Sequence, residues 1–136
     1  MLGFLDRLQA YQPHVLGLLR IMTGLLFLQF GCAKILGILP WPSGQPAFLS
    51  LIWFAGMMEL VGGALITIGF GTRLVAFLCS GEMAVAYFLS HFPRGFIPLG
   101  NGGNLAILFC FVFLYLAVAG GGAFSLDSSR AKSSTM

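Results

Sequence analysis

The chain has 136 residues, of which 58% are hydrophobic and only 8% are charged, and its net charge at pH 7 is +3. Average soluble domains carry about 25% charged residues, and so few charges cannot cover the surface of a water-soluble fold. The composition therefore predicts lipid around most of the exterior, and the length suits one domain. The basic residues are scattered and form no stripe, which gives no case for a nucleic-acid partner.

Residues 1–13 predict a short interfacial segment that precedes the first membrane crossing. Leu2, Leu5 and Leu8 recur at near-helical spacing, as in a helix that lies on the membrane surface. A frayed terminus is the alternative interpretation. Asp6 and Arg7 interrupt the segment, and it lacks the ordered charged start, apolar run and cleavage site of a signal peptide.

Residues 14–122 contain four apolar stretches that suit membrane crossings, since a crossing helix needs about 20 mostly apolar residues. They run from about Val15 to Gly37, Phe48 to Phe70, Arg73 to His91, and Gly103 to Ala119. Barrel strands would be shorter and would alternate apolar with polar residues. We therefore predict an all-α membrane protein, a four-transmembrane-helix antiparallel bundle. Residues 123–136 are small and polar and predict a disordered tail.

The distribution of lysine and arginine predicts the orientation in the membrane. Four crossings place both termini on one side. The residues on that side are Arg7, Arg20, Arg73, Arg130 and Lys132, and those on the other side are Lys34 and Arg94. Basic residues favour the cytoplasmic side, so both termini are expected in the cytoplasm. The short link from Gly69 to Arg73 also predicts that the second and third helices are antiparallel neighbours.

The three cysteines predict packing residues and no metal site. Cys32, Cys79 and Cys110 each lie in an apolar run and form no CxxC pair, which argues against a disulfide framework or a zinc site. The sequence has no haem-attachment motif, iron–sulfur cysteine cluster or dinucleotide loop. Any electron transfer would therefore need a partner protein or a diffusible quinone.

Two carboxylates are expected near the middle of the membrane. Glu59 lies mid-way along the second helix, and Glu82 lies nine residues beyond Arg73, which is a depth of roughly 14 Å. A charged side chain at this depth costs roughly 2.5–3.5 kcal/mol on insertion scales. Burial and mutual repulsion both favour the neutral carboxyl form, so one of the two can be neutral at pH 7.

Arg20 is the expected counter-charge for these carboxylates. It lies about two turns into the first helix, on a seam of small residues formed by Gly17, Gly24 and Gly31. Such a seam lets another helix approach closely. Arg20, Glu59 and Glu82 thus form the predicted intramembrane polar site. Two interpretations stay open, namely a buried pair that sets helix register and a functional pocket for a proton, a quinone or a small anion.

Four further polar residues are secondary candidates. Lys34 is interpreted first as a residue that snorkels to the outer interface, and Arg73 as the end of a loop that binds headgroups. His91 is interpreted as an interface residue that could titrate. Asn104, after Asn101 and two glycines, predicts a loop and a helix N-cap. Both tryptophans are interpreted as interface anchors or packing residues.

The chain resembles the DoxX family of small bacterial membrane proteins along nearly its whole length. The resemblance rests on six segments in order: Gly31-Cys-Ala-Lys34, Glu59-Leu-Val-Gly-Gly63, Gly69-Phe-Gly-Thr-Arg73, Glu82-Met-Ala-Val-Ala-Tyr-Phe88, Pro98-Leu-Gly-Asn-Gly-Gly103, and Gly120 through Ser125-Leu126-Asp127. It implies a four-helix bundle in the bacterial inner membrane. Many relatives have an acidic residue after the paired glycines, where this chain has Asn104.

The resemblance also narrows the functional hypotheses. Some archaeal relatives are similar to subunits of a thiosulfate:quinone oxidoreductase, and some actinobacterial relatives are linked to a superoxide dismutase and a sulfurtransferase. The first hypothesis is therefore an accessory subunit in membrane redox chemistry or oxidative and thiol-stress handling, with a quinone as the conceivable cofactor. The alternatives are a non-enzymatic scaffold that recruits soluble redox enzymes, and a carrier of protons or small solutes. Whether the chain is an enzyme stays open, as does its oligomerisation.

Overall fold

The computed structural model describes residues 2–134, which form helices joined by short loops and contain no strand. The α-helices are α1 (Leu2–Leu8), α2 (Gln12–Gly31), α3 (Leu51–Ile68), α4 (Thr72–Ala86), α5 (Pro98–Asn101), α6 (Asn104–Ala119) and α7 (Leu126–Ser134). Two π-helical turns extend α2 and α4, namely η2 (Cys32–Leu36) and η3 (Tyr87–His91), and the 3-10 turns are η1 (Gln9–Tyr11) and η4 (Phe92–Arg94).

Three continuous helical stretches are long and apolar enough to cross a membrane, and a shorter apolar helix follows them. The three stretches are Leu2–Leu36, Leu51–Ile68 and Thr72–Arg94, and the shorter helix is Asn104–Ala119. Large apolar side chains such as Leu74, Phe77 and Leu108 are exposed along the outer faces, as expected where lipid is the solvent. The predicted all-α membrane fold is therefore confirmed.

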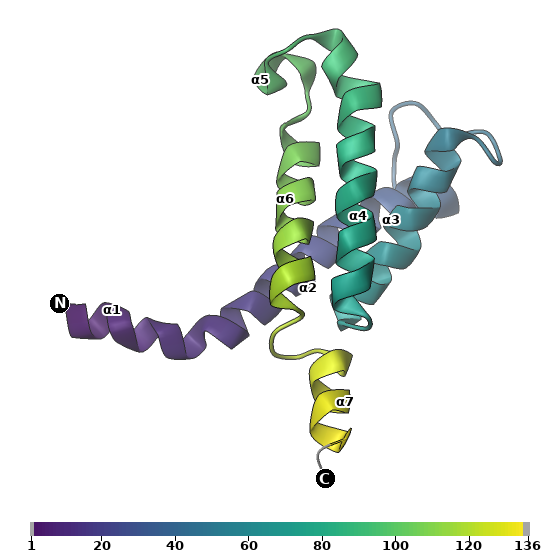
Figure 1. Ribbon diagram of the computed structural model, residues 1–136. Helices are drawn as coiled ribbons and strands as arrows, with labels where there is room; N and C mark the ends of the chain where they lie inside the picture. The colour runs from purple at the N-terminus through teal and green to yellow at the C-terminus, as the bar shows by residue number, and fades with distance from the viewer. Residues whose placement is uncertain (1, 135–136) are drawn as a thin grey trace.

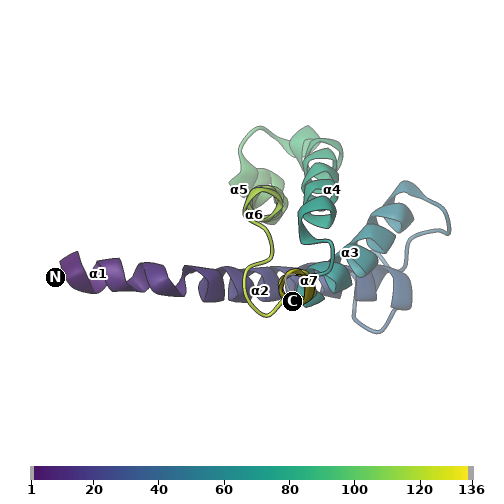
Figure 2. The same cartoon turned by 60° about the horizontal axis from the view of Figure 1, so that its bottom comes forward.

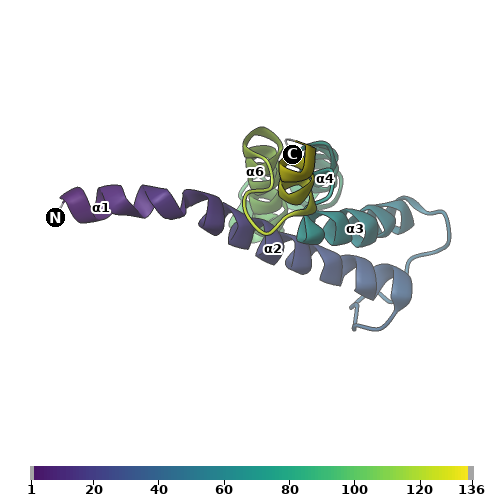
Figure 3. The same ribbon diagram turned by 90° about the horizontal axis from the view of Figure 1, so that it is seen from below.

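The four apolar helices are arranged as two antiparallel pairs that cross each other. α2 packs mainly on α3, and α4 packs mainly on α6 (Figures 1 and 3). α3 and α4 meet near the turn Gly69–Gly71, but each contacts its own pair partner more extensively. We call the end with this turn the turn end. The other ends of the two pairs carry residues 37–50 and 95–103, which Figure 2 shows apart from each other, and we call both of them the loop end.

The α2–α3 pair is held close by glycines, because backbone of the partner helix lies where a side chain would be. A Cβ at Gly31 would lie 2.3 Å from the Leu60 nitrogen, and one at Gly63 would lie 2.6 Å from the Leu28 nitrogen. Gly24 meets Thr67 of α3 in the same way. The predicted small-residue seam is confirmed, and it explains why α3 packs more extensively on α2 than on α4.

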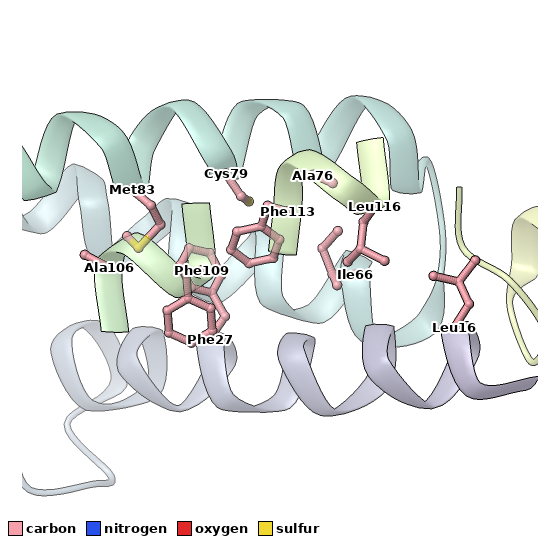
Figure 4. Packing of buried hydrophobic residues seen from close by; sticks show 10 residues of the cluster. All are labelled: Leu16, Phe27, Ile66, Ala76, Cys79, Met83, Ala106, Phe109, Phe113 and Leu116. Carbon is pink, nitrogen blue, oxygen red and sulfur yellow. The ribbon is translucent and has the colours of Figure 1, made fainter. Parts of the chain in front are cut away.

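An aromatic core joins the two pairs. Phe27 of α2 is fully buried, and its ring centroid lies 5.3 Å from that of Phe109 and 4.8 Å from that of Phe113 on α6. Figure 4 shows these rings beside Ile66 of α3 and Cys79 of α4. The edge-to-face geometry is favourable for aromatic pairs. This core excludes polar groups from the centre of the molecule.

The two terminal segments differ in how they match the prediction. α1 contains no buried residue and continues through η1 into α2 (Figure 1), so the interfacial segment is helical, while its position on a membrane stays a prediction. The tail predicted to be disordered instead forms α7, because Asp127 at its start bonds to the turn end. Met1, Thr135 and Met136 lie outside the described residues.

Candidate functional site

An ion pair between Lys34 and Glu59 lies in the membrane-spanning region. The Lys34 Nζ is 3.0 Å from the Glu59 Oε1, and the two side chains are 11% and 5% exposed. Lys34 belongs to the π-helical turn η2, and its Cβ lies 2.9 Å from where a Cβ of Gly56 would be. Because Gly56 has no side chain, the lysine can pass close to α3 and reach a carboxylate one turn further along that helix.

Two aromatic rings cover the lysine of this pair. The Lys34 Nζ lies 4.8 Å from the ring centroid of Trp41 and 6.0 Å from that of Phe30. The two rings pack edge-to-face, with centroids 6.0 Å apart. A cation within about 6 Å of an aromatic face is attracted by the ring quadrupole. Trp41, from the loop between α2 and α3, therefore stabilises the ammonium and shields it from solvent.

Glu82 completes the cluster from the third membrane-spanning stretch, but it has no hydrogen-bond partner. Both of its carboxylate oxygens are buried and unpartnered within residues 2–134, and so is the Oε2 of Glu59. Glu82 lies within electrostatic range of Glu59 and Lys34. We call Lys34, Glu59 and Glu82 the polar triad. With both carboxylates ionised the triad carries one excess negative charge, and one bound proton or cation would neutralise it.

The thiol of Cys79 lies beside the triad. Cys79 is 2% exposed and lies one helical turn before Glu82, with its Sγ 2.7 Å from where a Cβ of Gly62 would be. Both carboxylates of the triad lie within electrostatic range of this thiol. Cys79 belongs to the buried core cluster, which agrees with its interpretation as a packing residue.

The prediction that Arg20 is the counter-charge of the two carboxylates is wrong. Arg20 is fully buried, but its Nη2 donates to the carbonyl oxygens of Ala123 (3.2 Å) and Phe124 (2.8 Å). Its Nη1 lies against Gly69 at the turn end. Fourteen residues separate Arg20 from Lys34, or roughly 21 Å along the helix. Lys34 forms the ion pair because it lies level with Glu59, so it does not simply extend to the interface as predicted.

The turn end is instead held by Asp127, which the sequence did not single out as a site residue. Its Oδ1 and Oδ2 accept hydrogen bonds from the backbone nitrogens of Gly71 and Thr72, each at 2.9 Å. These are the first free N–H groups of α4, so the carboxylate caps that helix. Partial burial opposes the charged form, but the N–H donors of Thr72 and Gly71 and the nearby charge of Arg130 outweigh it and lower the pKa of Asp127.

The remaining candidates lie away from the triad. The Arg73 Nη1 donates to the carbonyl oxygens of Ala117 (3.4 Å) and Val118 at the C-terminal end of α6, so it satisfies free helix carbonyls at the turn end. At the loop end, the His91 Nδ1 lies 3.2 Å from the Asn101 carbonyl oxygen.

Asn101, rather than Asn104, organises the loop before α6. The Asn101 Nδ2 donates to the Tyr87 hydroxyl (3.2 Å) and the Gly95 carbonyl (3.0 Å), and its Oδ1 accepts from the Gly103 nitrogen at 2.8 Å. Asn101 is 1% exposed. Asn104 is the exposed first residue of α6 and Gly103 is the N-cap, without a side-chain bond. The loop and helix N-cap predicted for the run from Asn101 to Asn104 are therefore present, with Gly103 rather than Asn104 as the N-cap.

Comparisons with known proteins agree with this architecture. The DoxX family model matches residues 15–92. An uncharacterised protein of Haemophilus influenzae is 39% identical over 129 residues, which cover 91% of this chain and 96% of the relative. The inner membrane protein YqjF of Escherichia coli K12 is 33% identical over 117 residues, covering 79% of this chain and 85% of the relative. No solved structure was found to match the chain.

The fold and the buried triad are those of a multi-pass helical membrane protein with ionisable side chains in its interior. The family match covers more than half of the chain and includes all three triad residues. The chain belongs to the DoxX family and is an inner-membrane protein.

Proposed function

We propose that the polar triad is a functional intramembrane site that takes up and releases a proton, and that the protein serves membrane redox chemistry or oxidative and thiol-stress handling as an accessory subunit. The observation that carries this proposal is the Glu82 carboxylate, whose two oxygens are buried beside the Lys34–Glu59 pair without a hydrogen-bond partner among the described residues. A purely structural cluster would be expected to satisfy its buried oxygens, because leaving them unpartnered is costly.

The donors and acceptors of the triad also suit a quinone headgroup. The ammonium of Lys34 has hydrogens beyond the one given to Glu59, and these could bond to a quinone carbonyl oxygen. The free oxygens of Glu59 and Glu82 could accept from the hydroxyl groups of the reduced form. The excess negative charge of the ionised triad disfavours a small anion.

Glu82→Gln is the sharpest test of a functional site, because it leaves the Lys34–Glu59 pair intact and preserves the side-chain shape. If the triad were structural, removing an unpartnered buried carboxyl would leave stability unchanged or raise it. We expect the variant to fold normally but to fail to restore peroxide and thiol-oxidant resistance in a strain that lacks the gene. Membrane levels measured by immunoblot would confirm that the protein is present.

The matched control is Asp6→Asn, which makes the same change of carboxyl to amide on an exposed residue of α1. It should restore resistance fully. A Glu59→Gln, Glu82→Gln double variant that also restores wild-type resistance would contradict the proposal. If, in contrast, stable co-purification of soluble redox enzymes persisted in that double variant, the scaffold hypothesis would gain support.

A further inference from the structure

Two of the buried polar clusters lie at different heights along α2 and its extension η2. The triad lies toward the loop end, where Lys34 is two residues before the end of η2. Arg20, with the carbonyl groups of Ala123 and Phe124, lies toward the turn end. Seven residues separate Phe27 from each of Arg20 and Lys34, which is about two helical turns in either direction.

The space between the two clusters is filled by apolar side chains. Phe27, Ile66 and Phe113 each have 0% of their surface exposed, and Phe109 has 5%. These side chains come from α2, α3 and α6 and lie next to one another (Figure 4). Close-packed apolar interiors rarely hold voids that water can occupy. This aromatic layer therefore separates the triad from the turn end.

The segment between α6 and α7, which we call the linker, also covers the turn end. The Ala123 nitrogen donates to the Pro13 carbonyl at 2.9 Å, and the Asp127 nitrogen donates to the Gly69 carbonyl at 2.9 Å. A Cβ at Gly17 would lie 2.4 Å from the Ala123 carbonyl oxygen. The linker is thus seated directly on α2 and on the α3–α4 turn, over the buried Arg20.

At the loop end the polar triad is covered less completely. The Lys34 side chain keeps 11% of its surface exposed, and a single loop residue, the partly exposed Trp41, stacks over its ammonium. Within residues 2–134, one side-chain bond joins the loop to η2, from the Gln45 Nε2 to the Ile35 carbonyl at 3.2 Å, and the Trp41 ring packs on Phe30. Rotation of the Trp41 indole would remove the nearer of the two rings over the ammonium, whereas reaching the triad from the turn end would require repacking the aromatic layer.

We infer that the triad exchanges its proton with the loop end only, and that Trp41 is the positioning residue that controls this access. This inference rests on the proposed function. The step is a proton transfer from hydronium to a carboxylate of the triad and back to water, so no electron moves. It excludes the carrier hypothesis, because a carrier must open to both faces.

Each element packed against Glu82 contributes to the charge environment of this exchange. α3 supplies Glu59 and η2 supplies Lys34. α4 itself supplies Cys79, which lies within electrostatic range of Glu82.

Access can be measured by thiol labelling at the triad. Glu82→Cys would be made in a background with Cys32→Ser, Cys79→Ala and Cys110→Ser, and treated with a membrane-impermeant methanethiosulfonate reagent. Right-side-out and inverted membrane vesicles expose opposite faces, and reporter cysteines at Gly44 and Ser129 would identify the loop end and the turn end. We expect labelling of Cys at position 82 only from the face that labels position 44, and at least tenfold faster after Trp41→Ala. The matched control Phe113→Cys should stay unlabelled from both faces.

Labelling from the face of position 129, or from both faces, would overturn the inference, and so would no labelling even after Trp41→Ala. Because the cysteine variants could misfold, the wild-type protein provides a second measurement. Infrared difference spectra of the same two vesicle types would follow the C=O stretch of a protonated carboxylic acid after an external pH change. The band should respond only when the loop end is outside. A band that Glu82→Gln and Glu59→Gln leave unchanged would instead count against the proposed function.

Discussion

At the residue scale, the decisive feature is the match in height between Lys34 and Glu59. Both lie on faces that small residues keep open, and Gly56 leaves room for the lysine stem. A lysine near a helix end would ordinarily extend to the interface. Here the Glu59 carboxylate and the ring of Trp41 both contact its ammonium. The lysine is therefore buried in an ion pair and does not extend to the interface.

Breaking this ion pair from one side should be costly. We expect Lys34→Met to lower the free energy of unfolding by about 3–5 kcal/mol, because it leaves the Glu59 charge buried without a partner. The double variant Lys34→Met, Glu59→Met should recover most of this loss, since well-packed apolar residues often replace a buried pair at little cost. Unfolding in detergent micelles, analysed as a double-mutant cycle, measures both values. The cycle also needs the single variant Glu59→Met, and a loss in the double variant equal to the sum of the two single losses would show that the pair makes no net interaction.

At the element scale, two kinds of contact determine how the helices pack. Glycines bring α2 and α3 into backbone contact, and a carboxylate from α7 caps α4. The cap joins the turn Gly69–Arg73 to the segment around Asp127. The two segments are in contact although 53 residues lie between Arg73 and Asp127 along the chain.

Gly31→Ala should disrupt the α2–α3 pair. The new Cβ would lie 2.3 Å from the Leu60 backbone nitrogen, and inserting a methyl group into a close-packed contact typically costs about 1–3 kcal/mol. Gly81→Ala is the matched control, because nothing lies within 4 Å of a Cβ there. The control should be neutral or slightly stabilising, since alanine favours a helix over glycine. Thermal denaturation of both variants in the same detergent makes the comparison, and equal melting temperatures would count against the seam.

Asp127→Asn should weaken the cap of α4 in a pH-dependent way. The pKa of Asp127 is lower in the folded protein than its ordinary value of 3.8, so its contribution to stability is fully present above that value. The contribution is lost as the pH falls from 3.8 through the lower pKa of the folded protein. We expect the variant to be less stable by about 1 kcal/mol at neutral pH, the typical cost of losing a cap.

Denaturation curves measured from neutral pH to below pH 3 test this dependence on Asp127. The difference between the wild-type protein and Asp127→Asn should shrink as the solution becomes more acidic. A difference that stays constant over this range would show that the charge of Asp127 does not contribute to the cap.

At the scale of the whole molecule, the chain separates a loop end from a turn end. The turn end carries Arg20, Arg73 and Arg130, whereas the loop end carries Lys34 and Arg94. Arg20 is fully buried and Lys34 is paired with Glu59, so the basic residues left for the membrane surface are Arg73 and Arg130 at the turn end and Arg94 at the loop end. This asymmetry favours the turn end, and therefore both termini, in the cytoplasm.

Reporter fusions measure this orientation directly. A fluorescent protein attached after the last residue should be bright, and alkaline phosphatase attached there should be inactive. Alkaline phosphatase inserted after Gly44, where a Cβ would have no non-neighbouring atom within 4 Å, should be active. The reverse pattern would place the termini outside the cell and turn the predicted proton exchange toward the cytoplasm.

The sequence by itself determined the four helices and their approximate ends, because a run of apolar residues long enough to span lipid has few other stable structures. It also identified the seam of Gly24 and Gly31 and both buried carboxylates. It could not determine which cation meets Glu59. Arg20 and Lys34 follow the seam with the same spacing, and only the relative shift of α2 and α3 distinguishes them.

The tertiary structure alone decided the remaining features. It brings Trp41 from a loop onto Lys34, seats the linker carbonyls of Ala123 and Phe124 on Arg20, and places Asp127 at the start of α4. These contacts join segments that are far apart in the chain or lie in irregular loops, where no periodic pattern reports position. They depend on how the helix pairs cross, and that crossing is set by close packing of particular side chains rather than by hydrophobicity along the chain.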